Sequence, residues 1–378
     1  LLDGVGPIHI NLQFDEPLLP DGAHEWLDGI KVQQLTKPSR VASTITPTTR
    51  KNIVIVGHDR AGFSVERIEK LAKDLGAPIV AEDPLSFESA VAHAPIILSD
   101  ERARDALKPE LLVVIGRTTL SRSINAYISG APYVMLIDPR LETVDTARSA
   151  AETHHEIPNL TSPIPKDDSW FELWAKYESR AAQSLESLPE WCEARVAATI
   201  AQELESDTAL FISSSRPIRD FEAFAQPRSA LVTYANRGLA GIDGNISTAL
   251  GIATHHDETV AVLGDLAFLH DISALTNPTK DALTIIVIDN DGGGIFSTLP
   301  QRNQPGFDRI FGTPHGKDLA KIVAGFEISH EVVRSVKELH IAMQRIHPGL
   351  HIIIAKMPHR EANADSLAEV SKRYSMLL

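Results

Sequence analysis

Residues 260–296 read VAVLGDLAFLHDISALTNPTKDALTIIVIDNDGGGIF and contain two apolar runs that each end in an acidic, glycine-bearing corner. The first run stops at Gly264 and Asp265, and the second stops at the sequence DNDGGG. Short apolar runs bounded by turn residues are typical of buried strands in a parallel sheet. We therefore predict two neighbouring strands whose carboxyl ends meet at one edge of a sheet, which is where open α/β sheets bind ligands.

The residue types at these two corners suit a metal-bound diphosphate. The carboxylate of Asp265, the side-chain carbonyl of Asn290 and the backbone carbonyl of Gly292 are hard oxygen donors, the kind of ligand that Mg²⁺ prefers. Glycines at positions 292–294 would let backbone amides approach phosphate oxygens. Either corner alone is common turn chemistry. Because both occur in one predicted sheet, we expect an anchor for a Mg²⁺-diphosphate.

An alternation of strands and helices continues on both sides of this stretch, which predicts βαβ crossovers and parallel sheets. We expect an α/β fold with two doubly wound parallel-sheet domains and the terminal strand of a third. The predicted strands cover residues 51–57, 77–82, 111–116, 133–138, 209–215, 229–236, 259–265, 283–289 and 351–358. The predicted helices cover residues 65–76, about 86–94, about 169–205, 245–253 and 271–275, with a closing helix after residue 358.

Two stretches have the composition of linkers, TKPSRVASTITPTTRK at 36–51 and HHEIPNLTSPIPKDD at 154–168. Ahead of the first linker, GPIHINLQF at 6–14 indicates a strand without a partner, and we expect it to be the end of a further domain. The predicted limits are the remnant of that domain at 1–25, a linker at 26–50, a central α/β domain at 51–165 and a diphosphate-binding domain at 166–378.

The length, composition and net charge of the chain limit the classes of protein to which it can belong. The 378 residues suffice for two domains, and 43% hydrophobic with 23% charged residues indicates an ordinary soluble core. A net charge of −14 argues against a nucleic-acid surface. No apolar run approaches the roughly 20 residues of a membrane span. The single cysteine, Cys192, has no internal disulfide partner, and we expect a cytoplasmic protein.

Three motifs around the corners resemble a single enzyme family. GD followed by DN resembles the thiamine diphosphate fingerprint of GDG and NN, with Leu266 in place of the third glycine and Asp289 in place of the first Asn. NRG-x-x-GIDG-x-x-STALG, GDL-x-FLHD-x-x-AL and DNDGGGIFS-x-LP together resemble the 2-succinyl-5-enolpyruvyl-6-hydroxy-3-cyclohexene-1-carboxylate synthase family of the menaquinone pathway. The resemblance covers essentially the whole chain, from GPIHINLQFDEPL onward.

The resemblance implies a thiamine diphosphate- and Mg²⁺-dependent carboligase, with Mn²⁺ as an alternative metal. Such an enzyme decarboxylates 2-oxoglutarate and adds the succinyl semialdehyde unit to isochorismate. It also implies that residues 1–25 end a pyrimidine-binding domain, that residues 51–165 form a transhydrogenase-like domain, and that the full-length protein is a homodimer or homotetramer. The family's catalytic Glu belongs to the first domain, so we expect none in this chain and expect the chain alone to be inactive.

The resemblance assigns the site residues position by position. The metal ligands are Asp265, Asn290 and Gly292. The implied cofactor contacts are Ile242, Asp243, Gly264, Leu266, Gly293, Gly294, Ile295 and Phe296. Ile242 matches the apolar residue that bends the cofactor and could equally be core, while Asp243 could equally be a helix N-cap.

Four polar residues are candidates for binding substrate. Both implied substrates are dicarboxylates, and the guanidinium fork of Arg pairs with both oxygens of a carboxylate. Arg219 and Arg237 follow predicted strands in the second domain, Ser215 lies four residues before Arg219, and Arg122 follows a strand of the central domain. A lone Arg is more often a solvated charge, but these motif positions favour a substrate pocket.

Several other patterns do not indicate chemistry. His270 and Asp271 form no dyad, because Asp271 is placed to cap the following helix. The pairs at 154–155 and 255–256 lack metal-ligand spacing, so we expect surface histidines. GHDRAG at 57–62 lacks the dinucleotide fingerprint. Two other functions remain open, another thiamine-dependent 2-oxoacid decarboxylase or carboligase, and a non-catalytic truncated paralogue that binds a diphosphate.

Overall fold

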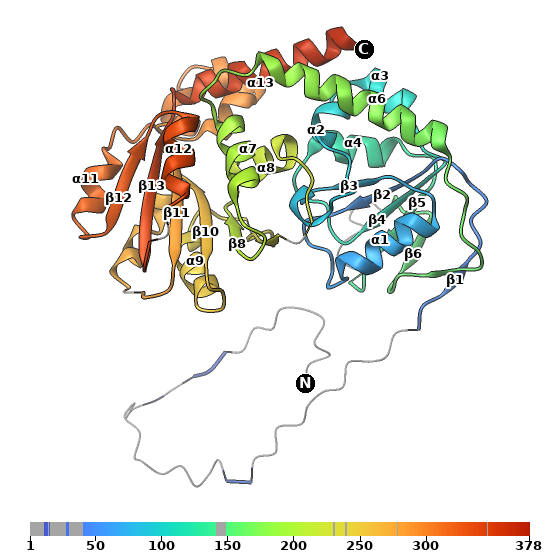
Figure 1. Ribbon diagram of the computed structural model, residues 1–378, viewed down its shortest axis with the longest axis horizontal. Helices are drawn as coiled ribbons and strands as arrows, with labels where there is room; N and C mark the ends of the chain where they lie inside the picture. Colours follow the sequence, from blue (N-terminus) through green and yellow to red (C-terminus); the bar gives the residue numbers. More distant parts are fainter. Residues whose placement is uncertain are drawn as a thin grey trace.

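The computed structural model describes residues 11–13, 15, 28–29, 41–140, 149–229, 231–238, 240–277, 279–345 and 347–378. Two parallel sheets, each flanked by helices, form its two halves (Figure 1). This confirms the predicted α/β class with two doubly wound sheets. The expected strand at 6–14 and much of the expected linker at 26–50 lie outside the described residues.

The first sheet has five parallel strands in the order β3-β2-β4-β5-β6. They are β2 (Asn52–Val56), β3 (Ile79–Ala81), β4 (Leu111–Ile115), β5 (Val134–Ile137) and β6 (Glu152–His154). The sequence predicted the four buried strands but not the edge strand β6, whose residues are polar and only half-buried. A separate two-stranded ribbon pairs β1 (Thr44–Ile45) with β7 (Asn159–Leu160).

Helices cover both faces of the first sheet. Successive side chains of β2 point to opposite faces, and both sets are buried against helices. Ile53 and Ile55 pack with residues of α2 (Ala94–Ile97), α4 (Arg122–Gly130) and α6 (Asp168–Ser184). Val54 and Val56 pack with residues of α1 (Val65–Asp74). The helices are α1 (Val65–Asp74), η2 (Pro84–Ser86), α2 (Ala94–Ile97), α3 (Glu101–Ala106) and α4 (Arg122–Gly130). The predicted helix at 86–94 is wrong, since the backbone at Ala90 instead bridges to Ile79 at the edge of the sheet.

The long helix predicted at 169–205 is also wrong, because the structure divides it. It consists of α6 (Asp168–Ser184), a short 3₁₀ turn η3 (Leu185–Ser187) and α7 (Glu193–Glu203). Pro189 lies in the break, where it has no N–H to continue a helix. α6 packs on the first sheet, with Trp170 and Trp174 in its core, whereas α7 packs on the second. α6 follows the predicted domain boundary at residue 165 but packs on the sheet that precedes it. The predicted domain limits stay a proposal.

The second sheet has six parallel strands in the order β12-β13-β11-β10-β8-β9. They are β8 (Ala209–Ile212), β9 (Val232–Tyr234), β10 (Thr259–Gly264), β11 (Leu283–Asp289), β12 (Ser329–Val333) and β13 (Leu350–Lys356). The two runs quoted at the outset are β10 and β11, which pair directly, as predicted. β12 was not predicted, because its sequence SHEVV is largely polar and it lies at the edge of the sheet.

Helices again cover both faces of this sheet. Val260 and Val262 pack with residues of α7 and α8 (Arg216–Phe224). Ala261 and Leu263 pack with residues of α9 (Asn245–Ala253) and α11 (Leu319–Ala324) on the other face. The α-helices are α8 (Arg216–Phe224), α9 (Asn245–Ala253), α10 (Asp265–His270), α11 (Leu319–Ala324), α12 (Val336–Met343) and α13 (Arg360–Leu377). Shorter turns are η4 (Ile272–Thr276), η5 (Gly294–Thr298), η6 (Pro300–Asn303) and the π-turn η7 (Asp308–Gly312).

The closing helix α13 joins the two halves. It leaves the second sheet after β13 and runs alongside α6 (Figure 1). Val370 and Tyr374 of α13 lie in the core that also contains Ile53 and Leu112 of the first sheet. Among the described residues, none of the helices has the length and apolar character that crossing a bilayer requires.

Candidate functional site

A cavity of about 330 Å³ opens at the carboxyl edge of the second sheet. The chain runs from β8 outward to β9 and then returns to β10 on the other side of β8. The loops after β8 and β10 therefore diverge, which leaves a crevice at this topological switch point. Ser215 follows β8, Asp265 follows β10 and Asn290 follows β11, and all three line the cavity.

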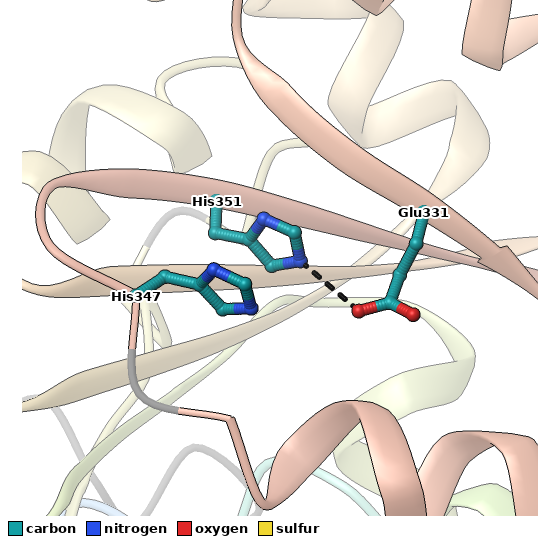
Figure 2. Close-up of side chains that lie close together, drawn as sticks. All are labelled: Glu331, His347 and His351. Carbon is teal, nitrogen blue, oxygen red and sulfur yellow. Dashed lines mark ion pairs between the residues drawn. The ribbon is translucent and has the colours of Figure 1, made fainter.

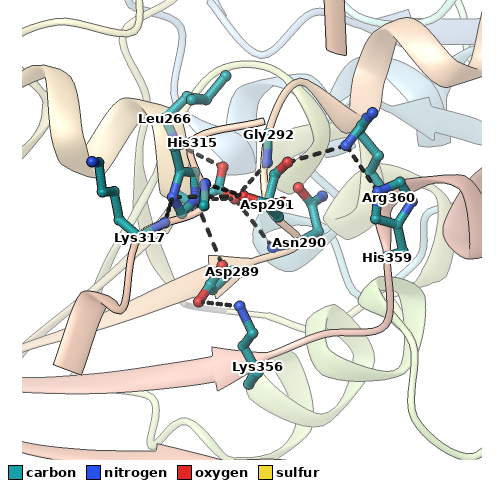
Figure 3. Close-up of polar contacts among 12 residues, drawn as sticks. Leu266, Asp289, Asn290, Asp291, Gly292, His315, Lys317, Lys356, His359 and Arg360 are labelled. Atoms are coloured by element: carbon teal, nitrogen blue, oxygen red, sulfur yellow. Dashed lines mark hydrogen bonds and ion pairs between the residues drawn. The ribbon is translucent and has the colours of Figure 1, made fainter. Parts of the chain in front are cut away.

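Asp265 is buried at the start of α10 and is held by backbone N–H groups. Its Oδ1 accepts a hydrogen bond from Leu266 N at 2.6 Å. Its Oδ2 accepts from Asn290 N at 3.2 Å and from Gly292 N at 2.9 Å. These bonds tie the ends of β10 and β11 together and fix the carboxylate (Figure 3). Each carboxylate oxygen has two lone pairs, and Oδ1 accepts only the bond from Leu266 N among the described residues, so Oδ1 keeps capacity for a cation.

The Asn290 side chain is oriented by Glu193 at the start of α7. Asn290 Nδ2 donates to Glu193 Oε1 at 2.6 Å. The amide oxygen Oδ1 of Asn290 is buried without a donor among the described residues. Burial is the main cause that raises the pKa of Glu193 to about 7, and the charge of Asp220 adds to it. The hydrogen bond to Glu193 holds the amide nitrogen of Asn290 toward α7, so the amide oxygen points away from α7.

The glycines after Asn290 have no room for side chains. A Cβ at Gly292 would lie 2.2 Å from Gly312 O, and one at Gly293 would lie 2.4 Å from Phe311 O. Gly292 also has φ +133°, which L-residues rarely adopt. Gly264, by contrast, has open space around its Cβ position. Close packing against residues 311–312 therefore requires glycine at 292 and 293, and all three glycines of 292–294 line the cavity.

Asp289, which replaces the first Asn of the thiamine fingerprint, is turned toward β13. Its Oδ2 pairs with Lys356 Nζ at 2.9 Å, and Lys356 is also its neighbour in the β11–β13 register. His315 Nε2 lies 3.3 Å from Asp265 Oδ2 and 3.8 Å from Asp289 Oδ1. The hydrogen bond to Asp265 is the main cause that raises the pKa of His315. A neighbouring Lys thus compensates the extra carboxylate (Figure 3).

Arg219 and Arg237 line the same cavity as the acidic corner. Arg219 Nη1 donates to Ser215 O at 2.7 Å. Arg237 Nη2 donates to Thr119 O at 3.0 Å, which links the second sheet to the loop after β4. Burial lowers the pKa of both guanidinium groups, and for Arg219 the charge of Arg237 acts in the same direction. Two desolvated cations at one site favour an anionic ligand.

Arg122 lies in a second, adjoining cavity of about 550 Å³. Arg216, Arg219, Ile295 and Phe296 line both cavities, so the two spaces meet at these side chains. Arg122 is the first residue of α4 and comes from the first half of the chain. The structure therefore brings all four predicted substrate residues to two connected cavities, with Arg122 one cavity away from Ser215 and Arg237.

Ser215 is held in an uncommon backbone conformation. It has φ +78° and immediately precedes α8, and a non-glycine residue in this region costs free energy that the surrounding fold must offset. Arg216, next to it, forms an ion pair with the buried Asp220. Burial is the main cause that raises the pKa of Asp220.

Two buried carboxyl groups, of Glu82 and Glu222, lie near Arg237 and act on its charge. Glu82 accepts from Thr119 N at 2.7 Å and from Leu120 N at 2.8 Å. Burial raises the pKa of Glu82, and it raises that of Glu222 well above its ordinary value, with the charge of Glu82 adding to the effect. Glu222 therefore favours its neutral form, which leaves the charge of the arginines less compensated.

Most predicted cofactor contacts also line the 330 Å³ cavity, namely Ile242, Gly264, Leu266, Gly293, Gly294, Ile295 and Phe296. Asp243 does not line either cavity and is exposed. It is also not the N-cap of α9, because Gly244 occupies that position with φ +66°. Asp271 does not cap the turn that follows it. Its carboxylate instead accepts from Ser247 N of α9 at 2.7 Å.

Reasoning from the sequence missed Glu193, Arg216, Glu222 and His315. Arg216 could have been found, because it lies between the two predicted residues Ser215 and Arg219. Glu193 could not have been found in this way. It is the first residue of α7, far in sequence from both Asp265 and Asn290, and it contacts Asn290 only because α7 packs on this sheet. His315 lies in a loop, TPHGKD, that has no recognisable pattern.

Two family models match the chain. One, described as "Middle domain of thiamine pyrophosphate", matches residues 21–212. The other, "Thiamine pyrophosphate enzyme, C-terminal TPP binding domain", matches residues 215–354 and therefore includes Asp265, Asn290 and the glycine loop.

Curated relatives of the chain are described as 2-succinyl-5-enolpyruvyl-6-hydroxy-3-cyclohexene-1-carboxylate synthases. The protein of Saccharopolyspora erythraea is 32% identical over 94% of this chain and 67% of its own length. That of Thermobifida fusca is 33% identical over 92% and 66%, and that of Listeria monocytogenes 29% over 96% and 69%. The chain spans about two thirds of the length of these relatives.

Proposed function

Because this chain belongs to the 2-succinyl-5-enolpyruvyl-6-hydroxy-3-cyclohexene-1-carboxylate (SEPHCHC) synthase family of thiamine diphosphate enzymes, we propose that it provides the diphosphate-binding half of a cytoplasmic carboligase. The reaction is decarboxylation of 2-oxoglutarate and addition of the remaining four-carbon unit to isochorismate. The observation on which this proposal rests is that one cavity contains both the Asp265–Asn290 corner and two desolvated arginines.

The residues present fit a Mg²⁺-bound diphosphate. Asn290 Oδ1 is a buried acceptor that lacks a donor among the described residues, and a cation would satisfy it. Asp265, Asn290 and the backbone carbonyl of Gly292 would hold Mg²⁺, or Mn²⁺ in its place, with phosphate oxygens and water completing the octahedron. When bound, thiamine diphosphate supplies the electron sink for decarboxylation and carbon–carbon bond formation.

The chain's own side chains position the substrates. Arg219 and Arg237 neutralise the carboxylates of a dicarboxylic acid, and Arg122 offers a further cation from the adjoining cavity. Ser215 places a hydroxyl at the same edge. Ile242 packs against the cofactor, while Ile295 and Phe296 exclude water from the reacting atoms. A monocarboxylic 2-oxo acid would leave one of these cations unpaired, so the arginines favour dicarboxylates.

The catalytic Glu of the family is expected in a pyrimidine-binding domain, and active sites are expected between subunits of a dimer or tetramer. We therefore expect the 378-residue chain to bind cofactor without catalysing turnover. Robust turnover by a sample of this mass would contradict that expectation.

Calorimetric titration with thiamine diphosphate tests the cofactor site. We expect binding to the chain in the presence of Mg²⁺, loss of binding when the metal is chelated, and loss in Asp265→Ala. The matched control is Asp257→Ala, which removes an exposed carboxylate between α9 and β10. Binding by Asp265→Ala that equals the unsubstituted protein would contradict the metal assignment.

Arg219→Ala tests the substrate class in the full-length enzyme. We expect kcat/KM for 2-oxoglutarate to fall roughly 100-fold because a charged hydrogen-bond pair is lost, while cofactor affinity stays unchanged. Arg67→Ala is the control, since this exposed residue pairs with Glu156 on the far side of the first sheet. Unaltered 2-oxoglutarate decarboxylation would favour a carboligase for monocarboxylic 2-oxo acids instead.

A further inference from the structure

A second cluster of metal-ligating side chains lies at the opposite edge of the second sheet from the cofactor cavity. Glu331 comes from β12, His351 from the start of β13, and His347 from the turn that precedes β13. One ligand atom of each residue lies within 4.8 Å of the others. Because β12 and β13 are parallel and adjacent, the cluster joins the edge strand to its neighbour near their amino ends.

The ligand atoms of the three side chains lie close together. Figure 2 shows the two imidazole rings side by side, with a nitrogen of each directed toward the carboxylate of Glu331. The rings stack with centroids 3.6 Å apart and planes inclined by 10°. His351 Nε2 lies 3.5 Å from Glu331 Oε1. Two ligands of a tetrahedral Zn²⁺ ion are separated by about 3.3–3.5 Å, given zinc–ligand bonds near 2.1 Å.

His351 is prepared to act as a ligand. It is only 2% exposed, and its Nδ1 lies 3.0 Å from Ser329 Oγ. With Nδ1 donating to that hydroxyl, Nε2 has a lone pair, and the outer hydrogen bond fixes the ring orientation as in known metal sites.

With both rings protonated at Nδ1, three atoms that carry lone pairs face one another, namely the two Nε2 atoms and an oxygen of Glu331. The Nε2 atoms of His347 and His351 are both buried and have no hydrogen-bond partner among the described residues. Both point toward a carboxylate oxygen (Figure 2). Such an arrangement is unfavourable unless a cation lies at its centre. One proton satisfies one pair of atoms, whereas a divalent ion satisfies all three.

We propose that Glu331, His347 and His351 form a binding site for a single transition-metal ion of the Zn²⁺ class, distinct from the cofactor metal. Two imidazoles and one carboxylate suit Zn²⁺ and Co²⁺ far better than Mg²⁺, which prefers oxygen ligands. The fourth position is left to water. The ion would fasten the edge strand β12 to β13.

Two neighbouring groups have to adjust when the ion binds. Arg345 Nη1 lies 3.2 Å from Glu331 Oε2, but more than half of the Arg345 side chain is exposed, so it can turn into solvent. His347 lies on a turn beside Pro348 and Gly349, which leaves its ring able to tilt out of the stack. Neither adjustment requires movement of a strand.

Cobalt absorption spectroscopy on the whole chain tests this site, with Co²⁺ alone as the probe. We expect one equivalent of Co²⁺ to give the intense visible bands of tetrahedral coordination, and Zn²⁺ to displace it. His347→Gln should abolish the bands with the circular dichroism spectrum unchanged, because this residue lies on a half-exposed turn. Stoichiometric Zn²⁺ should also raise the melting temperature of the unsubstituted chain and not that of His347→Gln.

Two controls separate this cluster from other histidines. His330→Gln removes the ring next to Glu331 on β12, where successive side chains point to opposite faces, and the bands should persist. His315→Gln removes the histidine of the cofactor cavity, and the bands should again persist. Absence of tetrahedral bands in the unsubstituted chain, their survival in His347→Gln, or their loss in His315→Gln would each overturn the proposal.

Discussion

Asn290 is set in place by a residue that the thiamine fingerprint does not include. Its amide nitrogen donates to Glu193 at 2.6 Å, and its amide oxygen has no donor in the part of the chain that the structure describes. An amide side chain can otherwise rotate and present nitrogen where oxygen is needed. Glu193 therefore acts as a positioning residue for the proposed metal ligand, without touching the metal itself.

Replacing Glu193 should weaken cofactor binding through Asn290. We expect Glu193→Ala to raise the dissociation constant for Mg²⁺-thiamine diphosphate roughly 10- to 100-fold, as is common for residues that orient metal ligands. Glu193→Gln should restore most of the affinity, since the Gln carbonyl also accepts from the Asn290 amide. Calorimetry at several Mg²⁺ concentrations measures both variants.

A merely structural role for Glu193 would give a different result. In that case the melting temperature of the metal-free chain would fall in Glu193→Ala while the Mg²⁺ dependence of binding stayed as in the unsubstituted protein. Glu203→Ala is a suitable control, because Glu203 belongs to the same helix and pairs with His340 on the outside of the sheet.

At this scale, the sequence predicts site residues that follow strands and misses those that packing brings in. Asp265, Asn290 and Gly292 follow from local chemistry at the ends of β10 and β11, and the structure places them in one cavity as expected. Their roles stay proposals. Glu193 reaches the same cavity only because α7 covers this face of the sheet, and no local pattern encodes that contact.

The helix α9 is capped by a residue from another element. Its N-cap position is Gly244, which has no side chain to accept a hydrogen bond. The carboxylate of Asp271, which follows α10, accepts from Ser247 N at 2.7 Å and from Ser247 Oγ at 3.2 Å. A negative charge at a helix N-terminus is stabilising. Asp271 thus connects α9 to the end of α10, the helix that begins with Asp265.

Removing this tertiary cap should loosen α9. We expect Asp271→Ala to lower the stability of the helix by about 1 kcal/mol, the usual effect of losing an N-cap acceptor. Asp271→Asn should retain part of it, because the amide oxygen can still accept. Hydrogen–deuterium exchange at residues 245–253 measures the change, and equal protection in Asp271→Ala and the unsubstituted chain would contradict it.

Among whole elements, the sequence predicted the buried strands best. β2, β4, β10, β11 and β13 are continuous apolar runs because both of their faces are covered. The edge strands β6 and β12 contain polar residues and were missed. The error at 169–205 has a similar origin, since helical periodicity on both sides of Pro189 concealed a change of direction from one sheet to the other.

The two halves of the molecule are joined at the end of α13. Asp100, the N-cap of α3, accepts from Arg102 Nη2 at 2.9 Å and from Ser375 Oγ at 2.9 Å. Arg102 Nη2 also donates to Ser375 O at 2.6 Å. The side-chain bonds from Arg102 are the main cause that lowers the pKa of Asp100 to about 2.

This contact should make the docking of α13 sensitive to acid. A carboxyl group with a depressed pKa in the folded state stabilises the fold above its ordinary pKa and loses that effect as the pH falls toward the folded value. Asp100→Asn should therefore weaken protection of residues 370–377 by up to about 1 kcal/mol at pH 7, a limit typical of exposed pairs.

The difference between Asp100→Asn and the unsubstituted chain should diminish as the pH falls below about 4, toward the folded pKa of about 2. Hydrogen exchange compared at pH 7 and pH 3 measures it. Asp105→Asn, in the same helix α3, is the control. A difference that grows on acidification would contradict the assigned role of Asp100.

The position of α13 also has a consequence for the order of folding. Tyr374 and Val370 complete a core whose strands begin at residue 52, so contacts of the first sheet span nearly the whole described chain. Contacts between residues distant in sequence form late, because the intervening chain must first be made and brought together. On a ribosome, α13 leaves the exit tunnel after the strands of both sheets, because it follows them in sequence. Of the two described sheets, the first precedes the second in sequence, yet its core is completed only by α13. Until α13 docks, the α13-facing surface of the first sheet is open to chaperones and proteases.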